Sequence, residues 1–145
     1  MSDYQDILTN VPHRYPFLLI DKIEQFEADT SVTTVKNVSF DEAQFSGHFP
    51  ETPVFPGVYI IENMAQSACY MLTKSSGGAD KNTIYYLGRV GKLSFLRPVY
   101  PGDCLVTSVK LEKKFGVSAS VIAKSTVNGK TVAKGELMFG AKKSS

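Results

Sequence analysis

The clearest pattern of apolar and polar positions in the chain predicts a helix over residues 57–74. Apolar side chains recur there at the i, i+3 and i+4 spacing of a buried helix face. This face carries Val58, Ile61, Ala65, Ala68 and Leu72, and a second apolar face carries Ile60, Met64 and Met71. A helix that is apolar over most of its circumference is typical of a protein interior, so we expect a sheet to wrap around it. The stretch SSGG at residues 75–78 is expected to end it.

Two strands are predicted ahead of this helix. Residues 1–16 have the pattern of a short helix and a turn, and residues 17–23 have the length and apolarity of a strand. Residues 31–38 are rich in β-branched side chains, which favour a second strand.

The chain after the helix has strand character from residue 83 to residue 141. Proline and glycine at residues 98–102 interrupt it, and a strand is expected at about residues 104–113. The pair Asn128-Gly129 lies between two alternating runs and predicts a hairpin, because a type I′ turn needs positive φ at both central positions. A long helix followed by a meander of antiparallel strands indicates an α+β fold, with a curled sheet around a central helix.

The amino-acid composition indicates which class of protein the chain belongs to. The 145 residues fit one domain spanning residues 1–145, and a hydrophobic fraction of 43% excludes a disordered chain. No apolar run approaches the ~18 residues of a membrane span, and the N-terminus has no signal-peptide pattern. A net charge of +2 does not indicate a nucleic-acid partner. Cys69 and Cys104 lack metal-ligand spacing, so we expect no metal site and a cytoplasmic protein with reduced thiols.

One carboxylate lies inside the helix that most needs burial. Glu62 and Gln66 are four residues apart and therefore share one side of the helix. An unpaired carboxylate costs several kcal/mol to bury, so this side either faces solvent at an edge or serves chemistry. The pattern alone leaves the two alternatives equally weighted.

His48 lies in the loop before the helix. A lone loop histidine is more often a surface or packing residue, but Pro50 and the two prolines that follow stiffen this loop. Gly57 then opens the helix, where free N–H groups and the positive end of the dipole face outward. A fixed imidazole, an acid and bare amides suit elimination next to a carbonyl group.

Three blocks of the sequence carry a resemblance to a known family. They are residues 12–21 (PHRYPFLLID), residues 47–66 (GHFPETPVFPGVYIIENMAQ) and residues 95–103 (FLRPVYPGD). The chain resembles the FabZ-type 3-hydroxyacyl-[acyl carrier protein] dehydratases, over nearly its full length. The resemblance implies the hotdog fold and dehydration of (3R)-3-hydroxyacyl thioesters to trans-2-enoyl thioesters.

The same resemblance implies roles for four residues. The histidine matching His48 removes the proton α to the thioester carbonyl, and the glutamate matching Glu62 protonates the departing β-hydroxyl. The amide matching Gly57 binds the thioester oxygen, and Gln66 is expected to steady Glu62 from one helical turn away. No metal and no organic cofactor is implied, because the thioester itself acidifies the α-carbon.

The family's active sites lie at a dimer interface, with the histidine and the acid supplied by different subunits. We therefore expect a homodimer, with a trimer of dimers or a hetero-oligomer with a related dehydratase as alternatives. The expected partner is an acyl carrier protein bearing the 3-hydroxyacyl chain on phosphopantetheine.

Several further residues are assigned to the acyl tunnel, to carrier-protein contacts or to structure. Candidate walls of an acyl tunnel are Phe49, Phe55, Ile61 and Met64, although each is also a plausible core residue. Candidate contacts to the acidic carrier protein are Arg89, Lys92 and Arg97, for which a solvated surface charge is the more common role. His13, in its proline-bounded turn, is expected to be structural.

Two departures from the family pattern put the substrate range in question. Phe55 stands where methionine is usual, and Asn63, next to the acid, stands where alanine is usual. Phe55 is expected to narrow or redirect the tunnel, and Asn63 to change the hydrogen bonding of Glu62. Fatty-acid synthesis and a specialised aryl-polyene or polyketide-like pathway both stay open. The competing functions are a hotdog thioesterase and a non-catalytic partner subunit, and the presence of both His48 and Glu62 disfavours them.

Overall fold

The computed structural model describes residues 3–77 and 83–143 of the chain. Gly78, part of the predicted helix end, lies outside these residues. The elements are α1 (Asp3–Asn10), β1 (Lys22–Glu27), β2 (Ser31–Asn37), the 3₁₀ turn η1 (Ala43–Ser46), α2 (Gly57–Ser75), β3 (Thr83–Phe95), β4 (Cys104–Phe115), β5 (Ser118–Val127) and β6 (Lys130–Lys143).

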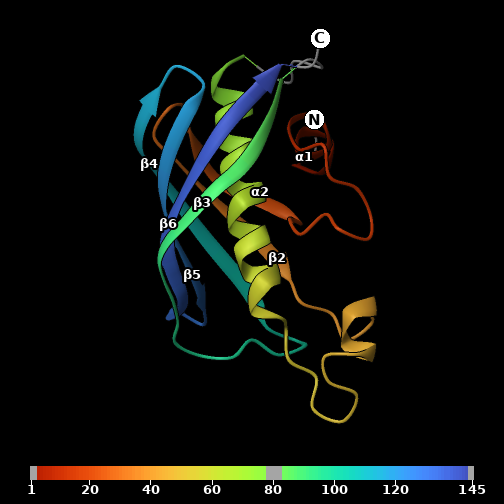
Figure 1. The fold of residues 1–145 in the computed structure, drawn as a ribbon. Helices are drawn as coiled ribbons and strands as arrows, with labels where there is room; N and C mark the ends of the chain where they lie inside the picture. Colours follow the sequence, from red (N-terminus) through yellow and green to blue (C-terminus); the bar gives the residue numbers. More distant parts are fainter. Residues whose placement is uncertain (1–2, 78–82, 144–145) are drawn as a thin grey trace.

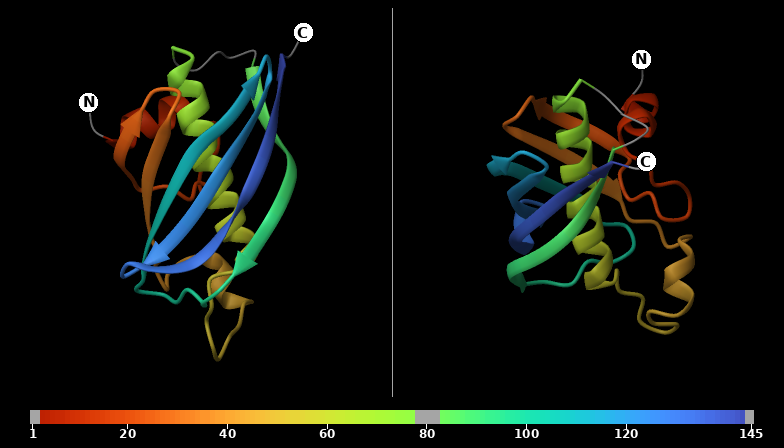
Figure 2. Two further views of the ribbon diagram at one scale, coloured as in Figure 1. Left: turned by 90° about the vertical axis from the view of Figure 1, so that its left-hand side faces the viewer. Right: turned by 45° about the horizontal axis from the view of Figure 1, so that its top comes forward.

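Within the described residues, six antiparallel strands form one sheet in the order β1-β2-β4-β5-β6-β3. The sheet curls around α2, which runs along its concave face and contacts β2, β4, β5 and β3 (Figures 1 and 2). The short α1 packs beside α2 and β1. The predicted α+β class and the curled sheet around a central helix are confirmed.

Two details of the predicted strands are wrong. β3 does not begin a meander, because it pairs with β6 and the chain then crosses the sheet to reach β4. The first strand begins at Lys22 instead of residue 17. The apolar run before it packs on α2, where Leu19 and Ile20 are buried, so apolarity there reflects helix contact and not sheet pairing.

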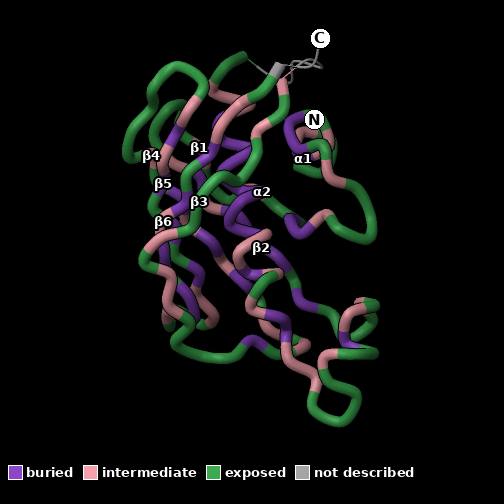
Figure 3. Tube along the Cα trace, viewed as in Figure 1, coloured by how far each residue is buried: buried purple, intermediate pink, exposed green. Residues whose placement is uncertain are grey.

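Most of the predicted apolar residues of α2 are buried (Figure 3). Ile60, Met64 and Met71 are almost completely buried. Ile61 is partly buried, and Val58, in the first turn, has 67% of its surface exposed.

The hairpin between β5 and β6 has the predicted geometry. Asn128 and Gly129 adopt φ values of 52° and 78°, the positive pair that a type I′ turn requires. This turn pairs Val127 with Lys130 and so fixes the register of the two strands.

A chain of polar side chains connects α2 with the middle of the sheet. Its members are Thr34, Asn63, Ser67, Thr107 and Ser125, all fully buried. Asn63 donates from Nδ2 to the Leu19 carbonyl at 2.7 Å, and its Oδ1 accepts from the Thr107 hydroxyl at 2.6 Å. Thr107 in turn accepts from Ser125 at 2.7 Å. Each of these five side chains therefore has a hydrogen-bond partner, as a buried polar group requires.

Replacing Asn63 by alanine is expected to lower the free energy of unfolding by about 2–4 kcal/mol, since the Leu19 carbonyl and the Thr107 hydroxyl lose a buried partner. Urea unfolding of the purified variant measures this change. The matched control is Asn37→Ala, the same substitution at an exposed strand end, where a change within about 0.5 kcal/mol is expected. Equal stabilities of the two variants would show that the buried network does not stabilise the fold.

Candidate active site

The loop between β2 and α2 presents His48 in a fixed place. The His48 backbone N–H donates to the Gln44 carbonyl of η1 at 3.0 Å, and the Val54 N–H donates to the His48 carbonyl at 3.1 Å. The Phe55 N–H donates to the Val99 carbonyl at 2.7 Å, which ties the loop to the segment after β3. The loop is thus anchored on both sides of the histidine.

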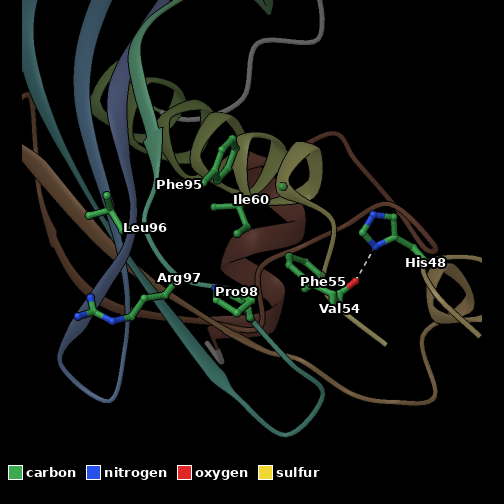
Figure 4. Close-up of a pocket in the computed structure, with 10 residues that line it drawn as sticks. His48, Val54, Phe55, Ile60, Phe95, Leu96, Arg97 and Pro98 are labelled. Atoms are coloured by element: carbon green, nitrogen blue, oxygen red, sulfur yellow. Dashed lines mark hydrogen bonds between the residues drawn. The ribbon is translucent and has the colours of Figure 1, made fainter. Parts of the chain in front are cut away.

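The side chain of His48 has a defined tautomer. Its Nδ1 lies 2.8 Å from the Val54 carbonyl oxygen (Figure 4). A carbonyl oxygen can only accept, so Nδ1 carries the proton of this hydrogen bond. In the neutral ring Nε2 then keeps its lone pair, which is the atom that a general base needs. The ring also stacks on that of Phe49, with centroids 4.1 Å apart.

His48 lines a cavity of about 360 Å³ together with the start of α2 and the segment after β3 (Figure 4). The lining residues are His48, Val54, Phe55, Gly57, Ile60, Phe95, Leu96, Arg97, Pro98 and Val99. The sequence did not single out Ile60 or the apolar residues around Arg97 as lining. The third family-like block, residues 95–103, contains the lining residues around Arg97 and was the available signal for them.

The N-terminus of α2 opens onto this cavity at Gly57. Pro56 supplies no side-chain cap. Among the described residues, Tyr59 is the first residue of this helix whose N–H donates to a backbone carbonyl, so the N–H groups before it have no backbone acceptor. The Gly57 amide is therefore available to an oxygen atom in the cavity, where the helix dipole favours negative charge. A Cβ at Gly57 would lie 3.2 Å from the Phe95 ring, so the close approach of β3 favours glycine here.

Glu62 lies in the second turn of α2, outside the set of residues that line this cavity. Its side chain keeps 24% of its surface exposed. Gln66 donates from Nε2 to Glu62 Oε2 at 3.0 Å and to the Phe17 carbonyl at 2.7 Å, while its Oε1 accepts from the Leu19 N–H at 2.8 Å. The expected Gln66–Glu62 contact is present, and within one chain His48 and Glu62 do not share a cavity.

Two residues near Glu62 have contacts that the sequence did not predict. Asn63 does not bond the acid, because its side-chain amide is engaged by the Leu19 carbonyl and the Thr107 hydroxyl. His13, expected to be merely structural, places Nε2 3.4 Å from Glu62 Oε2. Burial lowers the pKa of His13, as does nearby Arg14, whereas Glu62 raises it, and the net shift is downward.

The four candidate tunnel residues lie in different environments. Phe55 lines the His48 cavity and packs edge-on against Tyr59. Phe49 is half exposed beside His48. Met64 belongs to the core, and Ile61 is partly buried against it, so neither lines this cavity.

The three candidate carrier-protein contacts are all exposed. Arg97 lines the cavity, but its guanidinium turns away from His48 and donates to the Thr131 carbonyl at 2.9 Å (Figure 4). Lys92 lies 3.8 Å from Glu136 on β6, and Arg89 lies on β3.

In the part of the chain that the structure describes, no helix has the length and apolarity needed to cross a membrane.

Known structures share the arrangement of helix and sheet. The dehydratase heterocomplex ApeI:P from Xenorhabdus doucetiae aligns with a TM-score of 0.78 at 20% identity, covering 96% of this chain and 91% of that one. A hot-dog-like protein from Thermanaerovibrio acidaminovorans aligns with a TM-score of 0.65 at 18% identity, covering 82% and 85%. The predicted hotdog fold is confirmed.

Sequence comparison identifies the family. A family model for the FabA-like domain matches residues 11–136. The 3-hydroxyacyl-[acyl-carrier-protein] dehydratase FabZ of Vibrio atlanticus (strain LGP32) is 44% identical over 137 residues, 94% of this chain and 89% of that protein. FabZ of Vibrio parahaemolyticus is 45% identical over 139 residues, with the same coverage. The chain therefore belongs to the FabA-like family, in the group of 3-hydroxyacyl-[acyl-carrier-protein] dehydratases named FabZ.

Proposed function

We propose that the protein dehydrates (3R)-3-hydroxyacyl thioesters on acyl carrier protein to trans-2-enoyl thioesters. The observation that carries this proposal is the pairing of His48 with the start of α2 in one cavity. There an imidazole with a free Nε2 lies near an uncapped helix N-terminus. The FabZ relatives at 42–45% identity support the same activity.

The proposed reaction is an elimination that these groups divide between them. His48 Nε2 takes the proton from the α-carbon, and the electrons of that C–H bond form the Cα–Cβ double bond. The bond from Cβ to the hydroxyl breaks, and its electrons leave with the oxygen. Glu62 donates a proton to that oxygen, so water departs, while the Gly57 amide stabilises the negative charge that develops on the thioester oxygen.

A complete site under this proposal needs two chains, because His48 and Glu62 of one chain lie apart. The edge strand β3 is long and presents large apolar side chains to solvent, namely Ile84, Tyr86, Leu87, Val90 and Phe95. An open edge of this kind is a ready surface for pairing with a second chain. We infer a dimer in which β3 pairs with β3 of a second copy and brings Glu62 of one subunit to His48 of the other.

The proposal also assigns residues that contact the acyl chain and its carrier protein. Phe55, and Phe49 beside it, are proposed to contact the acyl chain where it enters from His48. Arg97, at the cavity, is the strongest of the three proposed contacts to an acidic carrier protein. We propose a 3-hydroxyacyl chain of fatty-acid synthesis as the substrate, since the protein belongs to the FabZ group.

The test is a dehydration assay with the wild-type protein and a panel of carrier-bound 3-hydroxyacyl thioesters, aliphatic and polyunsaturated or aryl. Formation of the 2-enoyl product is followed by mass spectrometry, and free thiol is measured in the same reactions. Enoyl product without thiol release supports the proposal, and the preferred chain identifies the pathway. Thiol release without enoyl product would indicate a thioesterase, and no turnover of any substrate would indicate a non-catalytic subunit.

A further inference from the structure

The carboxyl group of Glu62 is contacted on one oxygen only. Gln66 Nε2 lies 3.0 Å from Oε2, and His13 Nε2 lies 3.4 Å from the same atom. Among the described residues, no hydrogen-bond donor contacts Oε1. The two oxygens of the acid therefore have different environments, and a carboxyl group held this way would present a single oxygen to a reacting molecule.

The ring of His13 places its Nε2 atom 3.4 Å from that oxygen. Its Nδ1 is buried and has no hydrogen-bond partner among the described residues. An unpaired N–H in such a place costs more free energy than an unpaired lone pair, so the neutral ring favours the tautomer with its proton on Nε2. Burial and Arg14 lower the pKa of His13, which favours this neutral form. The Nε2 proton is then the one on the ring nitrogen that lies next to Glu62 Oε2.

The segment that carries His13 is fastened to α2 after the histidine and to the end of α1 before it. Asn63 and Gln66 bind the backbone of Leu19, and Gln66 also binds the carbonyl of Phe17. On the other side, Arg14 donates to the carbonyls of Leu8, Val11 and His13 at 2.7–2.8 Å. The ring of Phe17 packs near that of His13, with centroids 6.1 Å apart. These contacts hold the imidazole over Glu62 through a rigid backbone, as a precise site requires.

We propose that His13 is a positioning residue that, together with Gln66, holds Oε2 of Glu62, so that Oε1 delivers the proton to the leaving hydroxyl. In the protonated acid, Oε2 is the carbonyl oxygen, which accepts from Gln66 and lies beside His13 Nε2, and Oε1 bears the proton. The inference rests on the proposed dehydratase function and names which oxygen of the acid reacts. His13 does not touch substrate in this scheme and acts through Glu62.

Two amide substitutions at position 13 test the inference, because their side-chain amide groups differ only in how far they extend from the backbone towards Glu62. The amide nitrogen of His13→Gln occupies the place of Nε2 and is expected to keep most of the wild-type kcat. The amide nitrogen of His13→Asn occupies the place of Nδ1 and falls short of Glu62. We expect its kcat to drop about 10- to 100-fold through misplacement of the acid, with KM unchanged. The exposed neighbour Tyr15 supplies the control, since Tyr15→Asn changes the same turn without altering kcat.

Wild type and Glu62→Gln are measured in the same series, with thermal melting of every variant. A low kcat for His13→Asn, an unchanged KM and rescue by His13→Gln support the inference. Equal kcat values for the Gln and Asn variants, whether high or low, would overturn it, as would an effect on KM alone. Absence of turnover by the wild type would instead count against the proposed function, so the two failures are distinguishable.

Discussion

Replacing His48 by alanine is expected to lower kcat/KM for dehydration by about 10³-fold, the range in which general acid–base groups contribute. The reason lies in the loop: the Val54 carbonyl fixes the proton on Nδ1, so Nε2 is the one basic atom that this ring offers to the cavity. Steady-state kinetics with a carrier-bound 3-hydroxyacyl substrate measure the loss. Thermal melting checks that the loop variant still folds.

Chemical rescue distinguishes loss of the catalytic base from disruption of the active-site structure. Because the alanine variant leaves room where the ring stood, added imidazole is expected to restore part of the rate, whereas the same concentration should leave Glu62→Gln unchanged. A variant that retains more than about a tenth of the wild-type kcat/KM would exclude His48 as the base.

Combining two inactive chains is expected to restore activity. A hetero-oligomer of His48→Ala and Glu62→Gln chains contains, at each two-fold interface, one site with both defects and one site with neither. If the site is shared between subunits, such a preparation should have about half the wild-type activity, since two-fold symmetry makes two equivalent sites. Co-expression with two different affinity tags, followed by tandem purification, gives the mixed species for assay.

The controls are the two homo-oligomers, each carrying both tags, which should remain inactive. Activity in the mixed species alone would establish that His48 and Glu62 act across the interface. An inactive mixed species beside an active wild type would require the two residues to meet within one chain, contrary to the cavity described above.

Local signals in the sequence were sufficient to predict the helix and the hairpin. The spacing of apolar residues over residues 57–74 depends on neighbours one turn away, and Asn128-Gly129 encodes its own turn. The predicted strand at residues 17–23 was wrong because an apolar run is equally compatible with packing on a helix. There, distant amides from Asn63 and Gln66 take the place of a strand partner.

The residues that form the site could be predicted only in part. His48, Gly57, Glu62 and Gln66 lie in one continuous stretch, which made them visible as a motif and as an i, i+4 pair. The approach of His13 to Glu62 depends on how a distant turn folds back over α2, and no spacing encodes it. The crossover of β3 to the far edge is likewise a property of the whole sheet, since its partner β6 is the last strand in the chain.

The buried polar chain around Asn63 has a consequence for how the protein would select the length of its acyl substrate. It occupies the space between helix and sheet with hydrogen-bonded groups, which an alkyl chain cannot replace without leaving donors and acceptors unpaired. Under the proposed function, this part of the subunit interior is closed to the acyl tail. The tail would instead extend along the outer side of α2, where a second copy would form the opposite wall. Chain-length selectivity then becomes a property of the assembly, adjustable by residues that leave the folding of a single chain untouched.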